Sequence, residues 1–464
     1  MKHYDETNPA SIFEYSKQLL GKTLRDYAPL NYVEQTGKGG LGEMVEKLFF
    51  GYENNSDPHA DFLIAGVELK CSPLKKNKKK SYSVKERLVC NMINYVEDVN
   101  VPFDKSHFFL KCRLMLILYY LHIANVSRLD LEFIYSILWK LPEKDLLIIQ
   151  HDYEVIMEKV KKGKAHEISE GDTMYLGACR KGAKGTDVTA QPYSPIPAPT
   201  RAFCLKMAYM RTILSYIEHS GKNAICNYAI PNEQLVSALA LQHKSFDDIV
   251  LERFEPYIGK YAEDISFPEV SLYESRIACD KKKPKHDLAM VAAAIASEGK
   301  TTQINKTEEF LKAGLTLKTI RIKANGRLPE SISFERIDYQ EVYDCEDWCD
   351  SRLYEIFTSR FLFVIFKEQN NGKADYVLEK AFFWTMPTKD LLTAEEYWNN
   401  IRDNVRNNKI EPKYFWKLKD HNKFHVRPKA RNSADLADNP NGGKCMKYGY
   451  WFNQEYMTQI IEEN

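Results

Sequence analysis

An internal repeat narrows the possible folds of this chain more than any other feature of its sequence. Residues 308–318 align with residues 60–70 without a gap, and six of the eleven positions are identical: Phe, Leu, Ala, Gly, Leu and Lys. Upstream, residues 289–295 align in the same way with residues 43–49. Blocks that recur in the same order indicate a duplicated domain, because chance similarity does not keep a common order.

The position of the repeats also predicts where the chain divides. Near the two expected domain ends, residues 427–430 weakly echo residues 180–183. A chain of 464 residues is long enough for two or three domains, each with its own core. The composition loosens between residues 220 and 232. We therefore expect two domains of one fold, over residues 1–225 and 235–464.

The first copy contains a short strand with two charged side chains. Residues 67–70 alternate apolar and charged side chains after a glycine turn, so Glu68 and Lys70 are expected on one face. If Asp61 ends the neighbouring strand, its carboxylate can meet Glu68, and two close carboxylates repel unless a hard cation such as Mg²⁺ lies between them. A lysine there could hold a phosphate oxygen or an attacking water, as in metal-dependent phosphodiester cleavage. The alternative interpretation is an amphipathic strand with a solvated glutamate and lysine.

The two copies differ where such chemistry would lie. Asp61 aligns with Glu309, Glu68 with Thr316, Glu46 with Ala292, and Lys70 with Lys318. Because a hard divalent cation needs several anionic oxygens, the second copy should bind Mg²⁺ poorly and keep only the fold. The contrast makes Glu46, one helical turn after Gly42, a candidate third carboxylate. An exposed helix residue is the alternative interpretation for Glu46.

Three further segments bear on the fold and on DNA binding. Lysines and an arginine follow Lys70 as far as Arg87, and they form either a solvated loop or a grip on phosphates. Residues 106–111 are a candidate strand, and the apolar run 114–121 is a buried strand or helix that is too short to span a bilayer. A helical stretch is expected around residues 129–162.

Composition restricts the class of protein. The chain has 65 basic and 64 acidic residues, so a basic surface for nucleic acid must be local. Ten cysteines are scattered without a CxxC pair, which favours free thiols in a reducing compartment over a zinc site. The N-terminus lacks the hydrophobic region of a signal peptide. We therefore expect a cytoplasmic protein without a membrane span.

The chain resembles the MutH mismatch-repair endonucleases and their restriction-enzyme relatives in three motifs: Gly39-x-x-Gly42-x-x-x-Glu46, Asp61-x6-Glu68-Leu69-Lys70, and Ser106-His107-Phe108-x-x-Lys111. One active copy followed by a degenerate one resembles the two-domain, GATC-cutting type II restriction endonucleases of the Sau type. The resemblance implies a mixed α/β fold. It would be a tandem duplication of a restriction-endonuclease-like domain, with a mixed sheet flanked by helices in each copy and the second copy degenerate.

The resemblance also implies roles for the motif residues in the first copy. The metal ligands would be Glu46, Asp61, Glu68 and the main-chain carbonyl of Leu69. Lys70 would position or activate the attacking water, and Lys111 lies where the family has a further functional lysine.

DNA contacts are implied in both copies. Lys38 occupies a DNA-contacting position before the glycines. In the family an Arg-Pro-Lys segment enters the major groove and reads GATC. The first copy has Cys179-Arg180-Lys181 there, so only Lys181 transfers, whereas the second copy keeps the whole segment with Arg427 and Lys429. We expect the second domain to bind a GATC-like site without cutting it.

The expected function is that of a type II restriction endonuclease. It would use Mg²⁺ to hydrolyse double-stranded DNA at GATC and leave 5′-phosphate ends. One intact site for two scissile phosphates predicts dimerisation on DNA or, alternatively, sequential nicking of the two strands. A restriction system predicts a cognate DNA methyltransferase in the same bacterial cytoplasm. The alternatives are a MutH-type nicking endonuclease of mismatch repair, a non-catalytic sequence-specific DNA-binding protein, and a nuclease for RNA or branched DNA.

Overall fold

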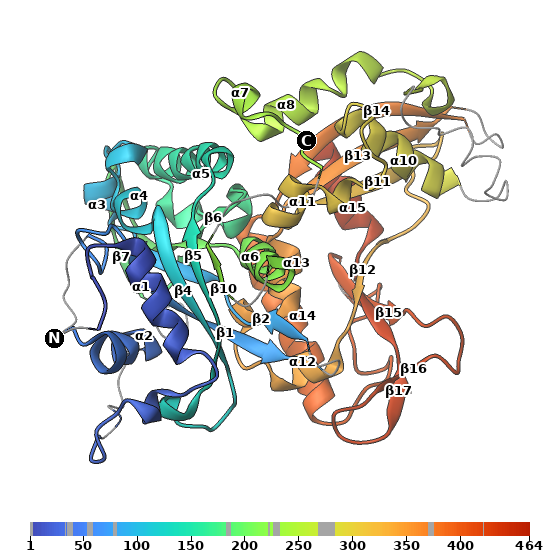
Figure 1. Cartoon of the computed structure of the whole chain (residues 1–464). Helices are drawn as coiled ribbons and strands as arrows, with labels where there is room; N and C mark the ends of the chain where they lie inside the picture. The colour runs from blue at the N-terminus through green and yellow to red at the C-terminus, as the bar shows by residue number, and fades with distance from the viewer. Residues whose placement is uncertain are drawn as a thin grey trace. The chain divides into compact units, whose positions relative to one another are not determined.

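The computed structural model of the chain describes residues 3–32, 34, 40–52, 59–77, 81–181, 187–220, 223–225, 233–267, 284–369, 375–420 and 422–464. The chain forms two compact units (Figure 1). One unit contains residues 1–245 with 311–314, and the other contains residues 246–310 and 315–464. The narrower domain limits predicted from the sequence, residues 1–225 and 235–464, stay a prediction.

The first unit contains a five-stranded mixed sheet, a three-stranded antiparallel sheet and a hairpin. In order across each sheet, the strands are β10 (Asn223–Ile225), β5 (Phe133–Lys140), β4 (Leu114–Leu121), β1 (Glu68–Lys76) and β2 (Tyr82–Val84); then β3 (Leu88–Met92), β9 (Arg201–Leu205) and β6 (Leu176–Arg180); and finally β7 (Val188–Gln191) with β8 (Ser194–Pro199). The apolar run at residues 114–121, for which the sequence allowed a strand or a helix, is the strand β4. Its residues 115–119 are fully buried because β4 has a neighbouring strand on both edges.

The helices of the first unit are α1 (Pro9–Ser16), α2 (Leu41–Met44), α3 (Tyr95–Asp98), α4 (His107–Cys112), α5 (Glu143–Lys161), α6 (Met207–Ser220) and α7 (Ala238–Leu241). The predicted strand at 106–111 is wrong, because Ser106 caps helix α4 by accepting a hydrogen bond from the Phe109 N–H at 3.1 Å. The helix expected around 129–162 is shorter, since β5 occupies its first part and α5 begins after Pro142.

The second unit repeats these elements. Its strands, in sheet order, are β11 (Thr316–Ile322), β13 (Phe361–Glu368) and β14 (Tyr376–Trp384); β12 (Ile332–Arg336), β18 (Tyr448–Phe452) and β15 (Phe424–Pro428); and β16 (Leu436–Asp438) with β17 (Lys444–Met446). Its helices are α8 (Phe246–Glu252), α10 (Pro284–Ala296), α11 (Glu308–Ala313), α12 (Tyr339–Asp344), α13 (Arg352–Thr358), α14 (Thr388–Arg406) and α15 (Gln454–Glu463).

The strand pairing confirms the tandem duplication. In the first unit β1 runs parallel to β4, β4 runs antiparallel to β5, and α5 follows. In the second unit β11, β13, β14 and α14 have the same order and the same directions. The two lysines of the repeat hold matching register positions, with Lys70 opposite Ile117 and Lys318 opposite Phe363. The mixed α/β class expected from the sequence is therefore confirmed.

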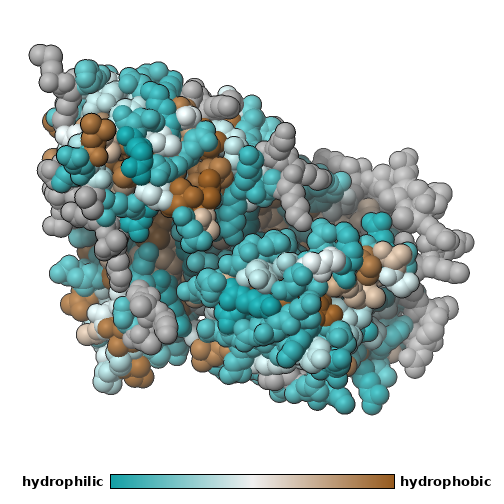
Figure 2. All heavy atoms as spheres, turned by 90° about the horizontal axis from the view of Figure 1, so that it is seen from below, coloured by the Kyte–Doolittle hydropathy of each residue, from teal (hydrophilic) through white to brown (hydrophobic). Residues whose placement is uncertain are grey.

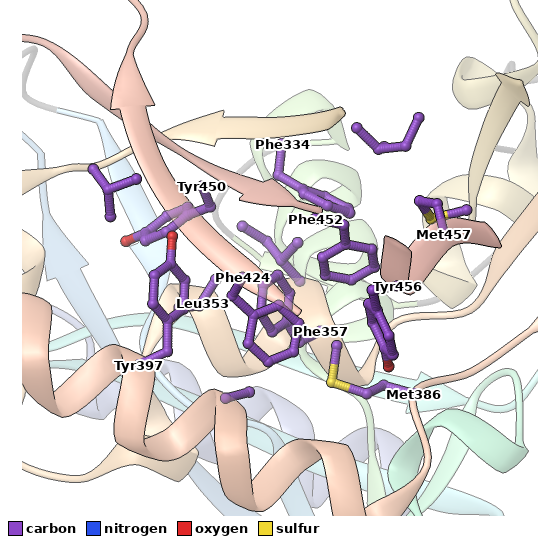
Figure 3. Packing of buried hydrophobic residues seen from close by; sticks show 14 of the residues in the cluster. Phe334, Leu353, Phe357, Met386, Tyr397, Phe424, Tyr450, Phe452, Tyr456 and Met457 are labelled. Carbon is purple, nitrogen blue, oxygen red and sulfur yellow. The ribbon is translucent and has the colours of Figure 1, made fainter. Parts of the chain in front are cut away.

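In the second unit, an aromatic core holds the sheet of β12, β18 and β15 against the helices (Figure 3). The rings of Phe334 on β12 and Phe452 on β18 lie 4.5 Å apart between centroids, and Phe357 on α13 lies 5.1 Å from Phe452. Offset and edge-to-face packing at such distances adds to the stabilisation from burial. The second copy has therefore kept a well-packed core.

The face of the molecule drawn in Figure 2 is mostly polar. Figure 2 shows hydrophilic side chains over most of the face in view, with hydrophobic ones in small separate groups. Within the described ranges, the helices are all too short or too polar to cross a lipid bilayer.

Candidate active site

A tight turn brings Asp61 beside Glu68. The main chains of Phe62 and Val67 exchange hydrogen bonds of 3.0 and 3.3 Å, and the turn between them closes at Gly66. Gly66 has a φ of +63°, which favours glycine because a side chain would strain this left-handed conformation. The turn lets Asp61 Oδ2 accept the Leu69 N–H at 2.8 Å, while the Asp61 N–H donates to Glu68 Oε2 at 3.3 Å.

Glu68 lies at the centre of the site. Its side chain is only 2% exposed, and Lys70 Nζ and Lys111 Nζ lie 2.7 and 3.5 Å from its Oε1. The contact with Lys70 confirms the prediction that these two side chains share one face of the strand. Burial raises the pKa of Glu68 to about 7, although Lys70 opposes this rise. At neutral pH, Glu68 is therefore protonated in a fraction of the molecules. This proton must leave before the carboxylate oxygens bind a metal.

The two lysines come from different elements. Lys70 lies on β1 and donates a second hydrogen bond of 3.1 Å to the Cys90 carbonyl oxygen on β3. Burial disfavours the charged form of Lys70, but Glu68 raises its pKa above the ordinary value. Lys111 lies on α4, whose start is set by Ser106. The structure thus brings Lys70 and Lys111 to one carboxylate, and the functional role of Lys111 stays a prediction.

Glu46 approaches the same cluster from the N-terminal helix. It lies on η3 (Val45–Phe50), a π-helical turn that continues α2 and ends at Gly51, whose φ is +70°. Burial and the charges of Asp61 and Glu68 raise the pKa of Glu46 to about 7. Within the part of the chain that the structure describes, the Glu46 carboxylate makes no hydrogen bond or ion pair. Because the charges of Asp61 and Glu68 act on Glu46, the three predicted carboxylates interact electrostatically.

The donor set suits a hard cation, although it is not gathered tightly. In the described ranges, no three His, Cys, Asp or Glu side chains are close enough to form a ready metal site. Carboxylate oxygens are nevertheless the ligands that Mg²⁺ prefers, and Glu46 is half-buried without a hydrogen-bond or ion-pair partner among the described residues. The ligand roles of Glu46, Asp61, Glu68 and the Leu69 carbonyl stay predictions.

The second copy keeps the scaffold of this site, but it has Thr316 and Ala292 where the first copy has Glu68 and Glu46. Gly314 has a φ of +67°, and the Leu315 N–H donates to the Phe310 carbonyl oxygen at 3.0 Å, as Val67 does to Phe62. Lys318 Nζ donates to the Ser333 carbonyl oxygen at 3.1 Å, which matches the contact between Lys70 and Cys90. Thr316 stands in the position of Glu68.

The hydrogen bond of Asp61 is also replaced in the second copy. Asn305 Oδ1, not the aligned Glu309, accepts the Leu317 N–H at 3.3 Å. Glu309 lies fully buried on helix α11. The alignment could not show this exchange, because Asn305 precedes the repeated block. An amide oxygen keeps the main-chain contact but contributes no negative charge for a cation.

The predicted DNA-binding residues of the first copy are placed only in part. Lys38 lies outside the described residues. Lys181 follows β6, and its N–H donates to the Thr200 carbonyl oxygen at 2.8 Å. Strand β6 belongs to the same three-stranded sheet as β3, whose Cys90 carbonyl holds Lys70. Lys181 is thus joined through one sheet to the strand that holds the candidate catalytic lysine.

Arg427 and Lys429 lie near one tryptophan in the second unit. The Arg427 guanidinium carbon and Lys429 Nζ lie 5.1 and 6.0 Å from the ring centroid of Trp451. Lys429 Nζ also donates to the Phe334 carbonyl oxygen. Arg427 is exposed at the end of β15, so its charge is available to a polyanion.

One residue near the carboxylates was missed by sequence reasoning. The hydroxyl oxygen of Tyr52, just after Gly51, is buried and has no hydrogen-bond partner among the residues that the structure describes. A single aromatic residue after a helix matches no functional pattern, so only its surroundings mark it.

Comparisons with known proteins show the family to which the chain belongs. Residues 50–152 and 299–396 match the family model of the DNA mismatch repair enzyme MutH. The chain is 30% identical to the type II restriction enzyme Sau3AI of Staphylococcus aureus over 98% of this chain and 94% of that protein. It is 26% identical to the DNA mismatch repair protein MutH of Shewanella woodyi over 38% of this chain and 76% of that protein. The chain therefore belongs to the MutH-related family of type II restriction enzymes, which are site-specific deoxyribonucleases.

Proposed function

We propose that the first unit uses Mg²⁺ to hydrolyse double-stranded DNA at GATC and leaves 5′-phosphate and 3′-hydroxyl ends. The observation that carries this proposal is the buried Glu68, held between Lys70 and Lys111 beside Asp61. The second copy preserves the turn and the lysine but has Thr316 in place of this carboxylate. Such a contrast within one chain favours a catalytic role for the carboxylates over a role in folding.

Each side chain of the cluster has a task in this mechanism. Glu46, Asp61 and Glu68 would hold the cation, together with the Leu69 carbonyl. When bound, Mg²⁺ would supply charge stabilisation at the phosphate and the leaving oxygen. Lys70 stays protonated beside Glu68, so it can orient the attacking water and balance the negative charge of the attacked phosphate. Lys111 adds a second positive charge on the same side of Glu68.

The second unit is proposed to bind a GATC-like site without cutting it. Arg427 can form a two-pronged contact with guanine in the major groove, worth roughly 1–3 kcal/mol of discrimination. Binding there would be linked to cleavage in the first unit if the two events favour the same state of the protein.

Replacing Arg427 by alanine is expected to weaken binding of a GATC duplex to a Glu68→Gln protein, which binds without cutting. The loss should be larger for GATC than for a scrambled duplex, because a guanine contact carries sequence information whereas a phosphate contact does not. Competition binding with both duplexes measures this difference. The exposed Lys413 provides a matched control, since Lys413→Ala removes a surface charge outside the reading segment. An equal loss for both duplexes would contradict base reading by Arg427.

The proposed setting is a restriction system in the cytoplasm of a bacterium. One chain offers one complete site and a palindrome presents two scissile phosphates, so two chains are proposed to meet on DNA. A DNA methyltransferase that protects the host sites is the proposed companion enzyme.

Cleavage of a plasmid by the purified protein with Mg²⁺ tests the function directly. We expect linear fragments whose ends, once sequenced, all begin at GATC with a 5′-phosphate. A MutH-type nicking enzyme, which the family match keeps as the second candidate, would instead leave nicked circles. Ends at other sequences would reject the GATC assignment, and an uncut plasmid with intact DNA binding would favour a non-catalytic protein. Cleavage of RNA or branched DNA alone would reject the proposed substrate.

A further inference from the structure

Tyr52 places an unsatisfied hydrogen-bond donor near the carboxylates. Its hydroxyl oxygen is buried and finds no hydrogen-bond partner within the described ranges of the chain. Leaving such a group buried without a partner costs about 1–3 kcal/mol. A donor that is kept at this cost calls for a functional explanation.

The main chain and the ring of Tyr52 are both anchored to the site. The Tyr52 N–H donates to the Glu46 carbonyl oxygen at 3.1 Å, which ties this residue to a candidate metal ligand. The ring packs edge-on against Phe62, the residue after Asp61, with centroids 5.4 Å apart. Tyr52 therefore bridges the helix that carries Glu46 and the turn that carries Asp61.

The environment of the hydroxyl is anionic. Burial raises the pKa of Tyr52, and the charges of Asp61, Glu46 and Glu68 raise it further. The phenol O–H of Tyr52 is a hydrogen-bond donor that a carboxylate oxygen can accept. Asp61 and Glu68 already accept hydrogen bonds from the main chain and from Lys70, whereas the Glu46 carboxylate has no partner among the described residues.

The second copy supports a link between the tyrosine and the carboxylates. If the alignment of 289–295 with 43–49 is continued without a gap, Glu298 stands in the place of Tyr52. Glu298 is exposed and pairs with Arg253 at 2.9 Å. The copy that lacks counterparts of Glu46 and Glu68 therefore lacks the tyrosine too.

We propose that Tyr52 is a positioning residue for the cation site, whose phenol O–H donates a hydrogen bond to the Glu46 carboxylate when a divalent cation is bound. This inference rests on the proposed function, because it requires that Glu46 is a ligand. Groups that hydrogen-bond to metal ligands orient them, and their loss typically weakens metal binding about 10–100-fold.

Tyr52→Phe removes only the hydroxyl and tests the proposal. The full-length protein without DNA is titrated with Mn²⁺, with affinity followed by calorimetry and by the electron paramagnetic resonance of free Mn²⁺. We expect binding weakened by about tenfold. In EDTA the midpoint of thermal unfolding should not fall, because the hydroxyl has no protein partner to lose.

Tyr119→Phe is a matched control. The Tyr119 hydroxyl is also buried without a partner, but burial alone raises its pKa, with no carboxylate contributing. Its loss should leave Mn²⁺ affinity unchanged. Glu46→Gln provides a second comparison, because a tyrosine that acts through Glu46 should add little to the loss in a double variant.

The outcomes separate the two proposals. If wild-type protein binds Mn²⁺ and Tyr52→Phe binds it equally well, the role of Tyr52 is rejected while the cation site stands. If Tyr52→Phe and Glu46→Gln have additive effects, Tyr52 does not act through Glu46 and the proposal is also rejected. If wild-type protein binds no Mn²⁺, the cation site itself fails and the proposed function must change.

Discussion

Replacing Glu68 by glutamine is expected to lower the rate of DNA cleavage by at least about a thousandfold. The change keeps the size of the side chain but removes the negative charge that faces Lys70 and Lys111. The site then loses a candidate metal ligand and keeps two lysines without their common partner. Linearisation of a plasmid with one GATC site, followed over time with Mg²⁺, measures the effect.

Thr316→Val supplies the control for this experiment. Thr316 occupies the matching position on β11, so the change alters the same register position in the degenerate copy. Cleavage by Thr316→Val should match that of the wild-type protein. Binding of GATC duplex in EDTA by Glu68→Gln should persist, which shows that the variant is folded. Normal cleavage by Glu68→Gln would remove the first unit as the proposed catalytic one.

Replacing Lys70 by methionine is expected to reduce cleavage by a comparable factor, about a thousandfold. Methionine keeps most of the buried stem, so the loss is that of the charged group that contacts Glu68 at 2.7 Å and the Cys90 carbonyl at 3.1 Å. Single-turnover cleavage with saturating protein isolates the chemical step from DNA binding. Without Lys70, the pKa of Glu68 should rise further, because the charge that opposes its rise is gone.

Lys318→Met removes the equivalent amine from the second copy. Lys318 makes the same kind of main-chain contact, with the Ser333 carbonyl at 3.1 Å, so both variants lose an equivalent structural hydrogen bond. Only the Lys70 variant should lose cleavage. Equal losses in the two variants would mean that the lysines serve folding, and the catalytic role of Lys70 would have to be abandoned.

Local sequence was sufficient where one strand carried the information. The alternation in residues 67–70 predicted that Glu68 and Lys70 share a face, and the 2.7 Å contact confirms it. The apolar residues of this alternation, Val67 and Leu69, are 0% and 4% exposed. The failure at residues 106–111 has a local cause, since the Ser106 cap starts a helix in a segment rich in aromatic residues.

Sequence by itself determined that this chain is a duplicated protein in which only the first copy has Glu46 and Glu68, because a repeat and its differences are visible along the chain. The mixed α/β class was implied by the resemblance to the MutH endonucleases. Only the tertiary structure decided which groups meet. Lys111 reaches Glu68 from α4, Asn305 replaces Asp61 at a main-chain amide, and the buried hydroxyl of Tyr52 lies among acidic residues. These contacts join elements that are distant in sequence or follow no repeating pattern, and burial, which sets the pKa values of Glu46 and Glu68, exists only once the chain has folded.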